Sequence, residues 1–121
     1  MRQKITIPLP ASVNAMYLYN PHSHQKIHKQ EVRDYYEYNT LVLQNWVKLH
    51  HVKPVEEMTH FDMEFFLSSK NADATNYLKI SMDLLEKAGV VSNDKFVMAR
   101  IQKVDYDKEN PRIIISWLSP A

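Results

Sequence analysis

The sequence predicts a single α+β domain, a mixed sheet packed by two helices, with the element order β-α-β-α-β-β. Two segments repeat apolar residues at helical spacing, and four segments alternate apolar and polar residues as strands do. A chain of 121 residues has room for one hydrophobic core. One sheet covered by two helices buries such elements most simply, so we take residues 1–121 as one domain.

The first half contains one strand and one long helix. In "KITIPLP" aliphatic residues alternate along a short strand that two prolines end. Residues 11–28 are rich in Asn, Pro, His and Tyr, so we expect a loop there. Apolar residues then recur three or four positions apart and predict an amphipathic helix over residues 29–50, which "VKP" is expected to stop because Pro54 cannot continue it. The aromatic residues of this helix that we assign to the core are Tyr35, Tyr36 and Trp46.

A strand and a second helix follow. "MTHFDMEFFL" alternates strictly, with four apolar side chains on one face and His60, Asp62 and Glu64 on the other. The next helix is predicted over residues 75–88. It is closed by Gly89, the only glycine of the chain, where a left-handed C-cap is expected.

Two further strands complete the pattern. "KFVMARIQKV" alternates Val97, Ala99 and Ile101, which predicts a strand. "YDKENP" reads as a turn, and "RIIISWL" predicts the last strand.

Composition excludes several classes of protein. Hydrophobic residues make up 45% and charged residues 24% of the chain, as in folded soluble proteins. No apolar run approaches the ~18 residues that span a bilayer, so we expect no membrane association, and "MRQKITIPLP" does not resemble a signal peptide. The absence of cysteine excludes disulfides and thiolate metal sites and favours a cytoplasmic setting.

Charge is distributed unevenly along the chain. Residues 1–53 carry seven Lys/Arg against three Asp/Glu, and residues 54–121 carry eight against eleven. This asymmetry favours a protein that binds a polyanion through its basic half and cations through its acidic half. Chance clustering is the alternative.

The stretch "NADATNYLK" places Asp73, Thr75, Asn76 and Lys79 where the second helix begins. Asp94 follows the far end of that helix, and a helix of about 14 residues holds its ends ~20 Å apart. Sequence spacing therefore does not by itself predict a shared site. Two interpretations stay open: a capped helix with surface residues, and a site that handles a metal ion and a phosphate.

The segment "DATNYLKISMDLLEKAGVVSND" resembles the core motif of the RusA-type Holliday junction resolvases. In that family a D-x-D-N-x-x-K run opens a helix, a K-A-G-like stretch closes it, and an acidic pair follows. The opening "IPLPASVNAMY" and the strand-turn-strand tail are more weakly similar to the family. The matching residues of the core motif are Asp73, Asn76, Lys79, Asp83, Lys87, Ala88, Gly89 and Asp94.

The resemblance implies a small homodimeric endonuclease that needs Mg²⁺, with Mn²⁺ as a substitute, and resolves four-way DNA junctions in recombination and repair. Asp73 and Asp94 would be metal ligands, and Lys79 would stabilise charge in the transition state, so these three are the candidate catalytic residues. Asn76 would support the ligands or lie at the dimer contact. The family occurs in bacteria and in their phages, so a prophage origin is one expectation.

The sequence departs from the family pattern at Thr75, where the family has a second aspartate, and at Asn93, where an acid is frequent. Thr75 keeps an oxygen that could face the metal, but one carboxylate fewer weakens divalent-ion binding. Asp62 and Glu64 are the candidates to replace it. The alternatives are a junction-binding protein with weakened or lost catalysis, and a dimeric interaction module without a DNA role.

The segment "NPHSHQKIHKQEVR" is basic, which predicts a DNA-binding segment that contacts phosphates. Tyr17 and Tyr19 nearby could stack on unpaired bases at a branch point. The alternative is a polar connector, and His22 with His24 forms only a weak metal signal because a third ligand is missing. The candidate DNA-binding residues are Lys26, His28, Lys29, Arg33 and Lys70.

Overall fold

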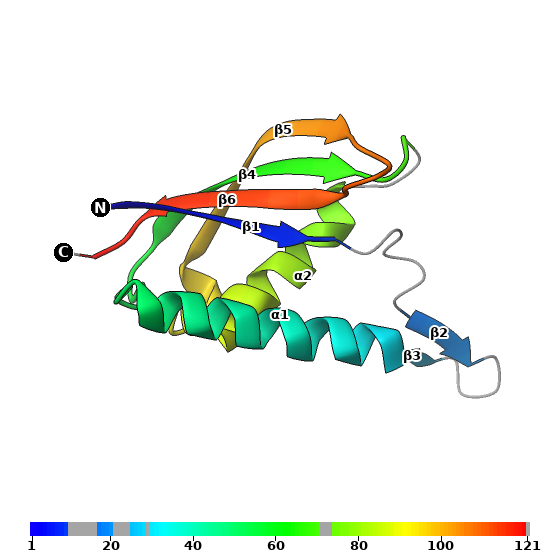
Figure 1. Ribbon diagram of the computed structural model, residues 1–121, viewed down its shortest axis with the longest axis horizontal. Coiled ribbons are helices and arrows are strands. Elements are labelled where there is room, and N and C mark those ends of the chain that lie inside the picture. The colour runs from blue at the N-terminus through cyan, green and yellow to red at the C-terminus, as the bar shows by residue number, and fades with distance from the viewer. Residues whose placement is uncertain (10–16, 21–24, 29, 71–73, 121) are drawn as a thin grey trace.

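A computed structural model gives the structure of the protein and describes residues 1–9, 17–20, 25–28, 30–70 and 74–120. It has one four-stranded sheet in the order β1-β6-β4-β5, with both long helices on one face of it (Figure 1). Neither helix is long and apolar enough to cross a membrane. The elements are β1 (Arg2–Pro8), β2 (Tyr17–Asn20), β3 (Gln25–His28), α1 (Gln30–Leu49), β4 (Thr59–Leu67), α2 (Ala74–Lys87), the short 3₁₀ helix η2 (Asp94–Phe96), β5 (Val97–Tyr106) and β6 (Arg112–Leu118).

The sheet is mixed, as predicted. β6 pairs antiparallel with β1 on one side and with β4 on the other, whereas β4 and β5 are parallel. Parallel neighbours need a crossover connection, and α2 provides it between β4 and β5. The predicted α+β architecture is therefore confirmed.

The core lies between the sheet and the helices. The apolar face of β4 is almost wholly buried, and Trp117 of β6 stacks on Phe61 with ring centroids 5.2 Å apart. Of the aromatic residues predicted for the core, Tyr36 is buried, and Tyr35 and Trp46 are half-buried against it. For β4, the strict alternation in the sequence predicted both the strand and the side chains that are buried.

Both helices end in the same backbone motif. At the end of α2 the N–H of Gly89 donates to the Glu86 carbonyl (3.1 Å) and that of Val90 donates to the Leu85 carbonyl (2.9 Å). These are the two bonds of a Schellman motif, and Gly89 has the left-handed φ of 82° that was predicted.

At the end of α1 the same two bonds run from His51 to Lys48 and from Val52 to Val47, with His51 at a φ of 51°. A histidine thus occupies the position that glycine fills in α2. The helix ends in this motif before Pro54 is reached. The expectation that the proline of "VKP" ends the helix was therefore wrong.

One expectation for the strands also needs correction. The expected loop over residues 11–28 contains the antiparallel hairpin of β2 and β3, whose strands of four residues are too short to give a clear alternating pattern. The strand predicted at "KFVMARIQKV" is present as β5, and its Ala99 and Ile101 are exposed. Their register with Phe61 and Met63 puts them on the helix-side face, but β5 is an edge strand and both side chains stay partly open to solvent there.

Candidate active site and DNA-binding groove

The residues of the predicted site lie at the two ends of α2. The helix begins at Ala74, and Thr75 and Lys79 are exposed on its first turns. Asp73 and the side chain of Asn76 lie outside the described residues. The predicted helix start is therefore correct to within a residue.

Asp94 lies at the other end of α2, in η2, and is half-exposed. β5 begins at Val97, paired with the first residue of β4, whereas α2 begins beyond the last residue of β4. Because α2 spans 14 residues, about 21 Å at 1.5 Å per residue, Asp94 and the start of α2 are far apart within the chain. Asn93, where the family often has an acid, instead caps η2: its side chain accepts a hydrogen bond from the Lys95 N–H (2.9 Å).

A groove of about 600 Å³ runs between α1 and α2. It brings Arg33, a predicted DNA-binding residue, together with Lys79, a predicted catalytic residue, from opposite halves of the chain. Lys87 adds a third cation, with its Nζ 4.6 Å from the centre of the Tyr36 ring. The residues that line the groove are Arg33, Tyr36, Glu37, Thr40, Leu41, Lys79, Asp83 and Lys87.

The model of the endodeoxyribonuclease RusA family matches residues 2–116, nearly the whole chain. The chain belongs to the RusA family. This assignment implies DNA hydrolysis at Holliday junctions as the class of activity, and family members generally depend on a divalent metal. A search of the curated proteins finds no match.

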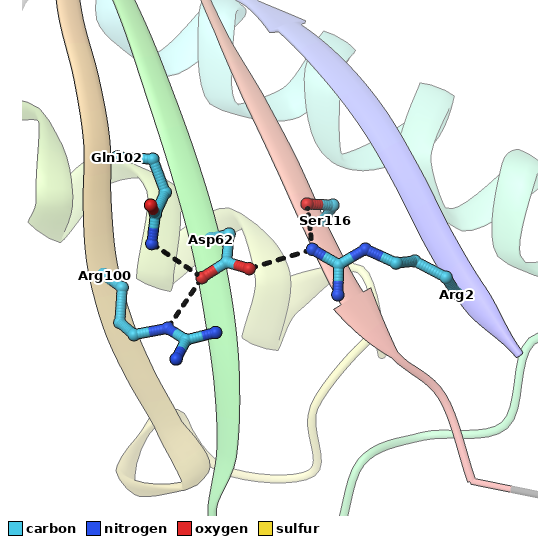
Figure 2. Close-up of polar contacts among 5 residues, drawn as sticks. All are labelled: Arg2, Asp62, Arg100, Gln102 and Ser116. Atoms are coloured by element: carbon cyan, nitrogen blue, oxygen red, sulfur yellow. Dashed lines mark hydrogen bonds and ion pairs between the residues drawn. The ribbon is translucent and has the colours of Figure 1, made fainter.

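Asp62 and Glu64 were the candidates to replace the carboxylate missing from the RusA motif. Both lie on the open face of the sheet, opposite the face that the helices cover. Asp62 is instead held by arginines from both sides (Figure 2): Arg2 donates to one carboxylate oxygen at 2.8 Å, and Arg100 donates to the other at 2.7 Å. Gln102 adds a bond of 3.2 Å.

The hydrogen bond from Arg100, followed by that from Arg2, lowers the pKa of Asp62 to about 2. Asp62 therefore acts as an anchor between β1, β4 and β5 and is not free to join a metal site. Sequence alternation placed Asp62 on the polar face of β4, but its arginine partners come from strands 60 and 38 positions away, which no local pattern reveals.

The described residues do not bring together a set of side chains that could hold a metal ion. Within the described ranges, no group of three His, Asp or Glu side chains is close enough to hold a metal ion. Asp94 is the single predicted carboxylate ligand among these residues, and Thr75 is neutral.

The remaining predicted DNA-binding residues are only partly described. Arg33 and Lys70 are exposed, Arg33 in the groove and Lys70 between β4 and α2. Lys26 and His28 belong to β3, but their side chains lie outside the described part, and so does Lys29 altogether.

Proposed function

We propose that this RusA-family protein is a Mg²⁺-dependent, structure-selective endonuclease that resolves Holliday junctions in recombination and repair. It is proposed to act as a homodimer in the bacterial cytoplasm, encoded either by the bacterial genome itself or by a prophage. The match of the family model over residues 2–116 carries this proposal. A four-way junction presents two equivalent scissile phosphates, and a two-fold dimer meets both.

Asp73 and Asp94 are the proposed metal ligands, with the Thr75 hydroxyl as a weak neutral one. When bound, Mg²⁺ or Mn²⁺ would supply water activation and neutralise charge on the phosphate. Lys79, exposed on α2, can place its ammonium against the developing negative charge. Asn76 is proposed to orient the ligands or to contact the partner subunit.

The groove between α1 and α2 is the proposed path of one DNA strand. Arg33 and Lys79 share it, so the same phosphate backbone can meet both a positioning cation and a catalytic one. Lys26, His28, Lys29 and Lys70 are proposed to extend this contact toward the hairpin and the start of α2. Tyr17 and Tyr19 of β2 are candidates for stacking on unpaired bases at the junction centre.

A second candidate function is junction binding with weakened or lost catalysis. Thr75 supports it, because it stands uncharged and exposed at the position where the family has an aspartate. Metal affinity falls with the number of charged ligands, so a site with Thr75 is expected to need a higher metal concentration.

Cleavage and gel-shift assays on four-way and linear DNA with Mg²⁺ or Mn²⁺ test both candidates. We expect wild type to cut the junction selectively, and Lys79→Ala and Asp73→Asn to bind it without cutting. Lys48→Ala is the matched control, since it removes an exposed lysine of α1 outside the groove. Binding without cleavage that Thr75→Asp converts into cleavage would favour the second candidate, and equal affinity for junction and linear DNA would refute both.

A further inference from the structure

Asp94 lies in a segment that is anchored on both sides to one stretch of the chain. Before it, the Val55 N–H donates to the Val90 carbonyl (2.8 Å), and the Ser92 N–H donates to the Val55 carbonyl (3.0 Å). After it, Val97 begins β5 and pairs with the first residue of β4. Both anchors therefore come from the stretch that leads from α1 into β4, and they hold Asp94 beside the start of β4.

The first of these anchors is buried. Val55, Val90 and Val91 are each at most 1% exposed. Breaking a backbone hydrogen bond in such surroundings leaves buried polar groups without partners, so these bonds open rarely. Only residues 93–96 lie between Ser92 and Val97, and any motion of Asp94 relative to the core must arise within them.

Asn93 closes the turn that carries Asp94. Its side-chain oxygen accepts a hydrogen bond from the Lys95 N–H (2.9 Å), and its carbonyl accepts one from the Phe96 N–H (3.1 Å). The helix η2 has three residues and few backbone bonds of its own, so an acceptor at its N-cap contributes much of its order. The Asn93 side chain thus fixes the backbone of Asp94 between the two anchors.

The Asp94 carboxylate itself is left free. It is half-exposed, and no hydrogen bond or ion pair joins it to another residue in the described ranges. The carboxylate of Asp62, by contrast, accepts hydrogen bonds from two arginines. A carboxylate with a fixed backbone and unengaged oxygens can contact a ligand without first breaking other bonds.

We propose that Asn93 is a positioning residue for the reaction: by capping η2, it holds Asp94 in the orientation in which the Asp94 carboxylate acts. This inference rests on the proposed nuclease function, which makes Asp94 a ligand. It also explains why position 93 does not need an acid, because asparagine, aspartate and serine all supply the acceptor oxygen of an N-cap.

Two substitutions of Asn93 test the role of the cap. Asn93→Ala removes the acceptor oxygen, whereas Asn93→Ser keeps one. We expect Asn93→Ala to cleave the junction with a kcat about tenfold lower at an unchanged KM, since a displacement of about 1 Å can cost up to about 100-fold. Asn93→Ser should keep kcat within about twofold of wild type, because serine caps about as well as asparagine.

Two further variants control for lost stability. Asp62→Asn removes an anchor on the open face of the sheet and should also destabilise the fold, but it should leave kcat unchanged at a temperature where all variants are folded. Ser92→Ala removes only the long hydroxyl bond to the Val55 carbonyl (3.4 Å) and keeps the backbone bond between the same residues. Its kcat should therefore match that of wild type.

A measurement without cleavage follows the same segment. In amide hydrogen exchange the Lys95 N–H should exchange about fivefold faster in Asn93→Ala than in wild type or Asn93→Ser, as expected for the loss of one capping bond. Added Mn²⁺ broadens the NMR signals of nearby amides. It should affect residues 93–96 only at higher Mn²⁺ concentration in Asn93→Ala than in the other two proteins.

The outcomes separate this inference from the proposed function. A wild-type kcat for Asn93→Ala, or equal losses in the alanine and serine variants, would overturn the positioning role and leave the nuclease function standing. A wild type that cuts no junction, but whose response to Mn²⁺ weakens in Asn93→Ala alone, would support the positioning role and refute cleavage. Neither cleavage nor a response to Mn²⁺ in wild type would refute the nuclease function and the positioning role together.

Discussion

Replacing Asp62 by asparagine should lower stability by an amount that the structure bounds. Asp62 has a side chain only 16% exposed, but its partners Arg2 and Arg100 are 54% and 49% exposed. Each partly solvated ion pair contributes about 0.2–1 kcal/mol, so two pairs that share one carboxylate should contribute about 0.4–2 kcal/mol. For a chain of this length the unfolding entropy is roughly 250 cal/mol/K, so Asp62→Asn should lower Tm by about 2–8 °C.

The pH dependence of this effect has a definite sign. The pKa of Asp62 is lowered to about 2 in the folded protein, against about 3.9 in an unfolded chain. The stabilisation is therefore fully present above about pH 4 and is lost as the pH falls through about 2. The free energies of unfolding of wild type and Asp62→Asn, measured by urea titration, should differ by a constant amount between pH 7 and about pH 4.5. Below that pH the two values should converge.

Glu64→Gln is the matched control, because it removes a carboxylate from the same face of β4 that makes no described ion pair. Its stability should stay within about 0.5 kcal/mol of wild type. Salt at 1 M should reduce the Asp62→Asn difference by screening. A variant as stable as wild type at pH 7, or a difference that persists unchanged at pH 2, would refute the role of Asp62 as an anchor.

Further predictions concern the helix ends and the groove. Gly89→Ala should lower the free energy of unfolding, measured by urea titration, by about 1–2 kcal/mol, because a φ of 82° strains the backbone of any residue with an L side chain. The added Cβ itself has room, since no described atom lies within 4 Å of it. At the matching position of α1, His51→Gly should stabilise by up to about 1 kcal/mol, and a loss of stability there would contradict the shared cap. Junction affinity should fall steeply as salt is raised. Arg33→Ala should reduce the slope of log affinity against log salt by about one while Lys48→Ala leaves it unchanged, and equal slopes for the two variants would remove Arg33 from the phosphate contacts.

The sequence by itself determined the features that depend on near neighbours in the chain. Strict alternation identified β4 and its buried face, helical spacing identified α1 and α2, and a single glycine marked the end of α2. The motif from Asp73 to Asp94 identified the family, because identities and spacing are properties of the chain alone. The short hairpin of β2 and β3 was missed, since four residues per strand carry too little periodicity.

Only the tertiary structure decided which distant segments meet. The alternation of β5 predicted a strand, but only the strand order made β5 an edge and left Ala99 and Ile101 exposed. Pairing between strands gave Asp62 two arginine partners, and packing of α1 against α2 placed Arg33 and Lys79 in one groove. Local periodicity fixes which face a side chain takes, whereas long-range pairing fixes what lies opposite that face.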